Sequence, residues 1–378
     1  MASNVWFISL AVFWGLITIG IQLVCLPLQV HDILGFDLVT VGWVMGMQSV
    51  ATLLSRPWAG RVTDRLGGKR AVTLGFVAIA VAGGLYACSS LPLNKIISLW
   101  LIVAGRLLSG TGEGLIITGG GAWAVSAAGT DKAGQAMSWI GLAMFAGLAA
   151  GATIGTQLNN GVMPLLLLLI TLSGVIVIHP LAVFRQATSE QSLPLHTVLR
   201  YITRPGLVLA LSSVGFSVVS SFVVLLFEIR NWADGGLAIA LFGLGHVSSR
   251  LAFSSRADRL TGKGWIPAML MAEASGLLLI ALASVPLLAL VGAMLVGLGF
   301  SMIYPLMIMP VLKSIPDGSQ GIVIGVYDAF FDIATGMAAL CGGVVANLIG
   351  MSGVFLIAGA AVVFGIVGVI TESQTRIR

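Results

Sequence analysis

Residues 55–70 read SRPWAGRVTDRLGGKR, and residues 249–264 read SRLAFSSRADRLTGKG. At a constant offset of 194 residues, both copies share a Ser-Arg pair, an Asp-Arg-Leu triplet and a Gly-Lys pair. Charged residues make up 9% of this chain, against roughly 25% in soluble domains, so these matches are hard to attribute to chance. The offset is about half of the 378 residues. It therefore predicts two duplicated halves in the same orientation, which is typical of transporters.

The sequence on either side of both copies is strongly apolar. Hydrophobic residues make up 58% of the chain and the mean hydropathy is +1.05. This composition cannot cover a soluble protein with polar surface, so it disfavours soluble enzymes, secreted disulfide scaffolds, disordered chains and nucleic-acid binders. The three cysteines all lie in apolar segments and have no metal-binding or disulfide spacing.

Twelve apolar stretches are long enough to cross a bilayer as helices, and far too long for the strands of a membrane barrel. They fall at about 5–30, 39–59, 70–90, 96–121, 134–158, 162–184, 205–228, 236–253, 265–284, 286–312, 319–345 and 350–371. We expect an all-α integral membrane protein with twelve transmembrane helices in two pseudo-symmetric six-helix halves. Residues 1–184 would form the first bundle, 185–204 a cytoplasmic linker with a short surface helix, and 205–378 the second bundle.

The distribution of positive charge predicts the topology. Of the 19 lysines and arginines, 14 lie in alternate loops, whereas the opposite loops hold only Lys95 and Arg230. Because positive residues collect in cytoplasmic loops, both termini are expected on the cytoplasmic side of the cell inner membrane.

The first copy of the repeat carries a recognisable motif. Its pattern, G-x-x-x-D-R-x-G-x-K-R, resembles the signature of the major facilitator superfamily after the second span. This resemblance implies that transport occurs by alternating access, with the motif as a cytoplasmic gate. We expect Gly60 to allow a close helix contact, and Asp64 to lie at a helix N-terminus, that of the eleventh span, and to pair with Arg65 or Arg70. The gate residues are Gly60, Asp64, Arg65, Gly67, Lys69 and Arg70, with Asp258 and Arg259 in the second copy.

Two spans carry charges at membrane depth. Arg106 and Glu113 lie two helical turns apart in the fourth span, on one face but about 10.5 Å apart along the axis. Asp328 and Asp332 share a face of the eleventh span, where two carboxylates cannot both be ionised cheaply, so one should hold a proton. All four are candidates for proton coupling. The alternative is that a carboxylate merely pairs with Arg106 or with the region of Arg56 as a structural contact.

The fifth span and the wider first quarter of the chain point to antiport. Gly147, Gly151 and Gly155 form a small-residue face that resembles the antiporter glycine motif of the superfamily. Ala152 stands where that motif has proline. The stretch LPLQVHDILGF at 26–36, with the gate motif, resembles a bacterial branch of drug or arabinose efflux-like proton antiporters.

Five polar residues in other spans are weaker candidates for a substrate cavity. Each could instead make a contact between helices, and the serines of the seventh span more often do so. They are Gln22, Gln48, Ser217, Tyr304 and Tyr327. Glu273, in the ninth span, is expected to be structural.

The predicted function is export of a small, amphipathic solute in exchange for protons. The alternatives are a proton-coupled importer of a sugar or organic acid, an exporter of a metal-chelating metabolite, or a receptor without flux. An enzyme is not expected, because the chain has no Walker A motif, no GxSxG and no metal-ligand cluster. The expected partners are the solute, protons and the lipid bilayer. No cofactor and no nucleic acid is expected, and the superfamily resemblance implies a monomer.

Overall fold

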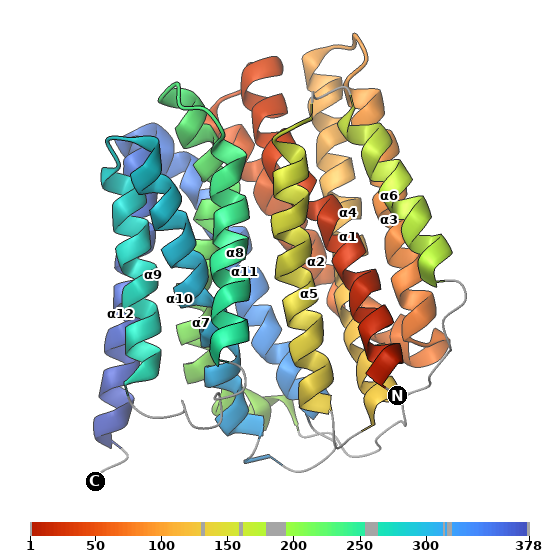
Figure 1. Ribbon diagram of the computed structural model, residues 1–378, viewed down its shortest axis with the longest axis vertical. Coiled ribbons are helices and arrows are strands. Elements are labelled where there is room, and N and C mark those ends of the chain that lie inside the picture. Colours follow the sequence, from red (N-terminus) through yellow and green to blue (C-terminus); the bar gives the residue numbers. More distant parts are fainter. Residues whose placement is uncertain are drawn as a thin grey trace. The chain divides into compact units, whose positions relative to one another are not determined.

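The computed structural model describes residues 2–129, 133–158, 162–178, 194–253, 264–312, 314–315 and 320–375. Within these ranges every regular element is a helix, and twelve of the elements are α-helices, so the predicted fold class is confirmed. The helices are α1 (Ala2–Leu28), α2 (Leu38–Leu66), α3 (Gly68–Ser89), α4 (Lys95–Ala128), α5 (Ala133–Gly155), α6 (Met163–Ile178), α7 (Leu195–Ile229), α8 (Gly235–Phe253), α9 (Trp265–Leu282), α10 (Pro286–Leu312), α11 (Gln320–Ile349) and α12 (Met351–Thr375). A π-helical turn, η1 (Gln29–Ile33), follows α1 (Figure 1).

The chain divides into two compact units, 1–188 and 189–378, and each contains six of these helices. The packing pairs of the first unit recur in the second when six is added to each helix number. Thus α1 packs on α5 and α7 on α11, α2 packs on α4 and α8 on α10, and α3 packs on both α4 and α6 as α9 packs on α10 and α12. The repeated helix pairing is the structural counterpart of the 194-residue sequence repeat.

Most of these helices have the length and composition of membrane spans. In the described part of the chain, nine helices are long and apolar enough to cross a bilayer, and α5 and α6 contain shorter apolar segments. Large hydrophobic side chains such as Trp43, Leu54, Trp100 and Phe364 are exposed on the helix surfaces. Such outward apolar residues would be unfavourable in water but suit contact with lipid.

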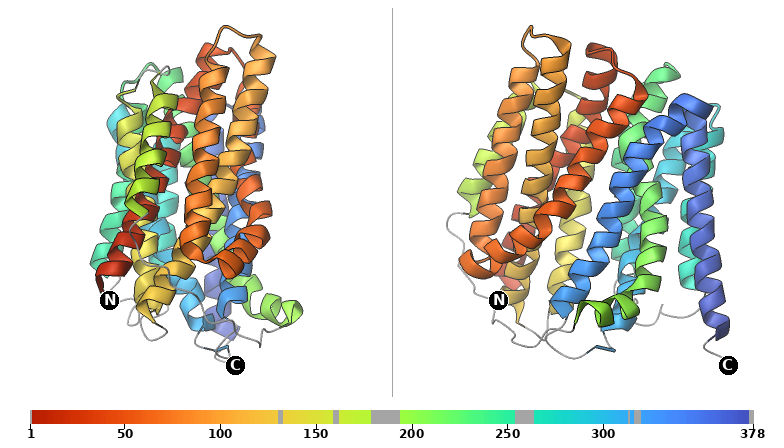
Figure 2. Two further views of the ribbon diagram at one scale, coloured as in Figure 1. Left: turned by 90° about the vertical axis from the view of Figure 1, so that its right-hand side faces the viewer. Right: turned by 180° about the vertical axis from the view of Figure 1, so that it is seen from behind.

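The short helix expected in the linker is continuous with the seventh span and forms the first part of α7. The α7 helix starts at Leu195, ten residues before the expected span, and contains Pro205. In Figure 2 the first, lime-green turns of α7 run crosswise to the rest of that helix. A proline inside a helix removes one backbone hydrogen bond and bends the axis, which accounts for the change of direction.

Glycines set the closest helix crossings in each unit. A Cβ built on Gly151 of α5 would lie 2.1 Å from the Ile17 carbonyl oxygen of α1, and one on Gly147 would lie 2.5 Å from the Phe13 carbonyl oxygen. Gly155 also faces α1, at Val24, although less tightly. The three glycines of the predicted small-residue face therefore lie in the α1–α5 contact.

We expect Gly151→Ala to destabilise the protein by about 1–3 kcal/mol, the usual cost of overpacking a filled contact. The new methyl group would collide with the backbone of α1, which cannot move away as a flexible side chain can. Gly84→Ala is the matched control, because a Cβ on Gly84 of α3 has no heavy atom within 4 Å among the described residues. Thermal unfolding in detergent should show a lower Tm for Gly151→Ala and an equal or higher Tm for Gly84→Ala. Equal shifts for both would contradict this account of the α1–α5 crossing.

Candidate functional site

Arg106 is buried in the first unit and holds the backbone of a neighbouring helix. Its Nε donates to the Val44 carbonyl oxygen at 3.3 Å, and its Nη2 donates to the Met45 carbonyl oxygen at 2.9 Å. Helical carbonyl oxygens keep a second lone pair and can accept such bonds. The third nitrogen, Nη1, is buried and has no hydrogen-bond partner among the described residues. Arg106 therefore joins α4 to α2, while the N–H groups of its Nη1 are buried without a partner among the described residues.

Glu113 lies two turns further along α4 and contacts the same helix α2. Its Oε2 accepts from Gln48 Nε2 at 2.7 Å and lies 3.3 Å from the Thr52 hydroxyl. That hydroxyl is also within bonding distance of the Gln48 and Gly110 carbonyl oxygens. A hydroxyl has one hydrogen to donate, so these three acceptors compete for Thr52. Which of the three acceptors binds the Thr52 hydroxyl depends on the charge of Glu113, because an ionised acceptor binds a donor more strongly.

Tyr86 of α3 links two further polar groups of the first unit. Its hydroxyl donates to Gln22 Oε1 at 3.0 Å and lies 3.2 Å from the Ser109 hydroxyl. Tyr86, Gln22 and Ser109 are all fully buried. Gln22 thus makes a contact between helices, which is the packing alternative to its predicted cavity role. We call Gln22, Gln48, Thr52, Tyr86, Arg106, Ser109 and Glu113 the N-terminal polar cluster.

Tyr86→Phe should destabilise the protein by about 0.5–2 kcal/mol, the range for hydrogen bonds between membrane helices. The change leaves the buried oxygen of Gln22 without the tyrosine donor and alters no packing volume. Tyr201→Phe is the control, because Tyr201 is 45% exposed. Unfolding titrations in mixed micelles measure both variants, and an effect of Tyr86→Phe no larger than that of the control would be the contradicting result.

The second unit has a corresponding cluster on α8, α10 and α11. The Tyr304 hydroxyl donates to Asp328 Oδ1 at 2.7 Å, and the Tyr327 hydroxyl donates to the Tyr304 carbonyl oxygen at 3.2 Å. Arg250 interacts electrostatically with Tyr304. Asp332, one turn after Asp328, is buried. We call Arg250, Tyr304, Tyr327, Asp328 and Asp332 the C-terminal polar cluster.

The predicted cavity residues of the second unit differ in their exposure. Tyr304 is half-buried, whereas Tyr327 is fully buried. Ser217 is also buried, and its hydroxyl donates to the Thr335 carbonyl oxygen at 2.6 Å, joining α7 to α11. Glu273 is fully buried and accepts from the Ser212 hydroxyl at 2.5 Å. Within the C-terminal polar cluster, the hydrogen-bonded pair of Tyr304 and Asp328 is half-buried and keeps accessible surface.

The gate motif forms the junction between α2 and α3. Gly67 connects the two helices with φ 87° and ψ 153°, a conformation that is essentially restricted to glycine. Arg65 and Arg70 are exposed and Lys69 is half-buried. The side chain of Asp64, and all of Asp258 and Arg259, lie outside the described structure.

Among the described residues, the close helix contact at the gate motif is made by Gly68, which directly follows the motif position Gly67. A Cβ on Gly60 has no heavy atom within 4 Å among the described residues. A Cβ on Gly68 would instead lie 2.5 Å from the Gly119 carbonyl oxygen and 2.6 Å from the Trp123 Cβ. The close approach therefore joins α3 to α4 at Gly68.

Four residues of the clusters were not predicted as site residues: Thr52, Tyr86, Ser109 and Arg250. Thr52 lies one turn after Gln48 on α2, so the helical spacing could have added it. Tyr86 is the only tyrosine in the first 200 residues, an isolated polar group in an apolar span. Arg250 was recognised only as the counterpart of Arg56 in the repeat, because its link to Tyr304 depends on the packing of α8 on α10.

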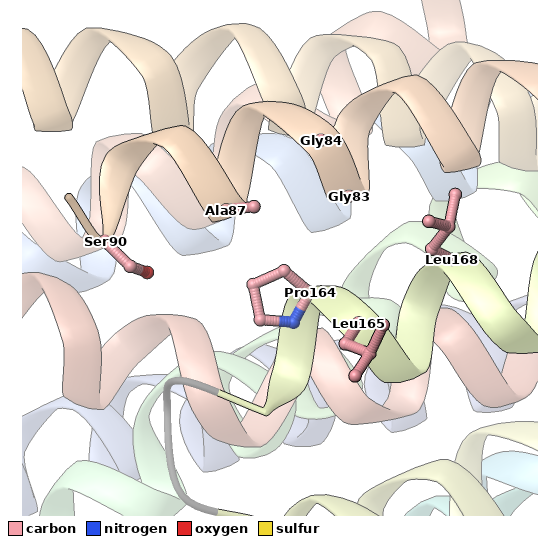
Figure 3. A pocket seen from close by; sticks show the side chains of 7 residues that line it. All are labelled: Gly83, Gly84, Ala87, Ser90, Pro164, Leu165 and Leu168. Carbon is pink, nitrogen blue, oxygen red and sulfur yellow. The ribbon is translucent and has the colours of Figure 1, made fainter.

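A surface hollow in the first unit lies apart from these clusters. It has a volume of about 260 Å³ and lies between the second half of α3 and the first turns of α6 (Figure 3). Its lining is Gly83, Gly84, Ala87, Ser90, Pro164, Leu165 and Leu168. None of these belongs to either polar cluster, so we do not place the functional site there.

Comparison with known proteins agrees with the fold and with the family resemblance. The Major Facilitator Superfamily model matches residues 6–233. The uncharacterized MFS-type transporter YhhS of Escherichia coli K12 is 33% identical over 356 residues, which cover 93% of this chain and 87% of the relative. The uncharacterized MFS-type transporter STM4428 of Salmonella typhimurium LT2 is 35% identical over 365 residues, covering 95% and 93%.

Solved structures share the fold at much lower identity. The D-xylose-proton symporter has a TM-score of 0.79 at 13% identity, with 97% of each chain covered. The human organic anion transporter MFSD10 has a TM-score of 0.75 at 19% identity, covering 97% of this chain and 98% of that one. The sequence matches extend over nearly the whole chain, and the twelve-helix architecture agrees with them. The chain is a multi-pass membrane protein that belongs to the Major Facilitator Superfamily of transporters.

Proposed function

We propose that this protein is a secondary active transporter that exports a small, amphipathic solute in exchange for protons. It would act in the cell inner membrane as a monomer, with both termini in the cytoplasm. The observation that carries the proposal is the position of Glu113: a carboxylate within a membrane span, half-buried, whose hydrogen bonds reach a second helix. Intramembrane acids are rare and usually functional.

The contacts of Glu113 suggest how a proton could change the helix arrangement. While the carboxylate is ionised, it attracts Gln48 and Thr52 of α2. A bound proton removes that charge, and the Thr52 hydroxyl can then donate to the Gln48 carbonyl oxygen of its own helix. The α2–α4 contact is thereby weakened at one of its two polar points, while Arg106 keeps the other.

The C-terminal polar cluster supplies the second part of the mechanism. Asp328 accepts a hydrogen bond from the Tyr304 hydroxyl and lies one turn from the buried Asp332. The presence of two carboxylates on one face of a membrane helix supports a role for this pair in proton exchange. We assign the proton that is exchanged for solute first to Glu113, with Asp328 and Asp332 as the alternatives in the second unit.

We further propose that the gate motif closes the cytoplasmic side when the transporter faces outward. The exposed guanidinium groups of Arg65 and Arg70 flank the rigid Gly67 turn. They are available for acidic partners, and the pairing with Asp64 remains a prediction. The second copy, with Asp258 and Arg259, would act in the same way.

The direction of solute movement under an imposed pH gradient tests this proposal. A drug and metabolite sensitivity screen of a deletion strain would identify solutes for flux assays. In everted vesicles, acidification of the lumen should drive accumulation of the solute, as antiport requires. If acidification of the lumen instead drove solute out of the vesicles together with protons, the result would favour a proton-coupled importer of a sugar or organic acid. Binding without flux would point to a receptor.

A further inference from the structure

The second unit contains four phenylalanines whose rings come together from four helices. Phe216 of α7, Phe242 of α8, Phe300 of α10 and Phe331 of α11 form what we call the aromatic cluster. Phe216 lies at its centre, with ring centroids 5.5 Å from Phe242, 5.6 Å from Phe300 and 5.8 Å from Phe331. These distances fall within the range of attractive aromatic pairs.

The rings of Phe216, Phe300 and Phe331 are nearly parallel, whereas the Phe242 ring is tilted by 34° to Phe216 and by 32° to Phe300. The interplanar angle is 7° between Phe216 and Phe300 and 23° between Phe216 and Phe331. Phe300 and Phe331 are also stacked, at 29°. Edge-to-face packing is an equally favourable geometry for aromatic pairs in a core. A stack in which ring faces are aligned can accept one more flat ring on its open side.

The exposure of the four side chains shows on which members the cluster is accessible. Phe242 and Phe300 are each 3% exposed and form the base. Phe216 and Phe331 are only half-buried. The cluster therefore differs from a closed core, in which all members would be covered.

Polar groups that could hold the other end of a solute lie next to the stack. Tyr304 follows Phe300 by one turn on α10, and Asp328 precedes Phe331 by three residues on α11, so each pair shares a helix face. Tyr304 and Asp328 are hydrogen-bonded to each other and both are half-buried. One wall of the second unit thus offers ring faces and, one turn away, a hydroxyl and a carboxylate.

We propose that this wall binds the transported solute, and that the solute carries a flat aromatic ring which stacks on Phe216 and Phe331. This inference rests on the proposed function, since it defines the substrate class of the same transporter. It assigns a role to four residues that the proton-coupling scheme does not use. The polar end of the solute would contact Tyr304 and Asp328.

Binding of an aromatic fluorophore tests the inference without any proton gradient. The purified full chain in lipid nanodiscs is titrated with N-phenyl-1-naphthylamine, and the signal from empty nanodiscs is subtracted. We expect saturable binding by the wild-type protein. Phe216→Leu and Phe331→Leu should each weaken it by about three- to ten-fold, the effect of one lost aromatic pair. Phe331→Trp should restore binding to near the wild-type level.

Two controls separate stacking from folding and from hydrophobicity. Phe355→Leu changes a fully buried phenylalanine of α12, outside the cluster, and should leave the dissociation constant unchanged. As competitors, 1-naphthylmethanol should displace the fluorophore at least about three-fold better than its ring-saturated analogue decahydro-1-naphthylmethanol.

Three outcomes would overturn the inference: no saturable binding, equal binding by the leucine variants, or equal competition by the saturated alcohol. None of them bears on proton exchange, which is measured separately. Conversely, a transporter that binds the probe but moves no proton would refute the proposed antiport and leave the aromatic site intact.

Discussion

Glu113→Gln is expected to reduce solute accumulation driven by a pH gradient by at least about ten-fold, while solute-for-solute exchange continues. Glutamine preserves the size of the side chain and stands in for the protonated, uncharged carboxyl, so the helices can still rearrange and exchange solute. It cannot release or bind a proton at physiological pH, so the step that couples solute to the gradient is lost. Proteoliposomes loaded with solute measure both activities in one preparation.

Glu228→Gln is the matched control for this variant. Glu228 lies at the end of α7 and is exposed, so its amide variant should keep both activities. If Glu113→Gln retained gradient-driven transport at the wild-type rate, the assignment would move to Asp328 or Asp332. If it lost exchange as well, Glu113 would be needed for the helix contact itself rather than for the proton.

Arg106→Lys is expected to lower both gradient-driven transport and solute exchange by at least about ten-fold. The guanidinium group reaches the Val44 and Met45 carbonyl oxygens with two different nitrogens. Lysine keeps the positive charge but carries one nitrogen on a flexible stem, so it cannot reproduce this fork. The variant should therefore separate the geometry of Arg106 from its charge.

Arg200→Lys provides the comparison for Arg106→Lys, because Arg200 is exposed on α7 and any effect of the arginine-to-lysine change at the surface would appear there. Size-exclusion chromatography establishes that both variants are folded. Wild-type transport by folded Arg106→Lys would show that charge alone suffices, and that the two carbonyl contacts are not part of the mechanism.

The fold could be predicted from the sequence because its determinants are local and repeated. Each apolar run is long enough to span a bilayer, and helices satisfy their backbone hydrogen bonds within the run. The 194-residue repeat predicted the duplication, which appears as matching helix pairs in the two units. The helix ends were predicted less well. The α7 helix continues through the polar residues before Pro205, and polarity by itself does not end a helix.

The candidate site was predictable only in part, because it depends on which helix faces which. The fixed rise of the α-helix separates Arg106 from Glu113 by about two turns, and in the structure each of them binds α2. The partners on α2 could not be predicted from α4 alone. Gly68 makes the same point, because it stands at an unspecified position of the motif and only the packing of α3 on α4 reveals its close contact. The proposed branch within the superfamily, and the proton-coupling roles, remain predictions.

The central claim is that the transporter binds either the solute or the proton, so that one displaces the other. Proton release on solute binding tests this claim most directly. Purified protein in weakly buffered detergent solution is mixed with a solute identified by the flux assays, and the pH is followed. The account predicts release of about one proton per protein, since two ligands that exclude one another must displace one another. The release should be lost in Glu113→Gln and kept in Glu228→Gln. Saturable solute binding with no pH change, or with proton uptake, would contradict the account.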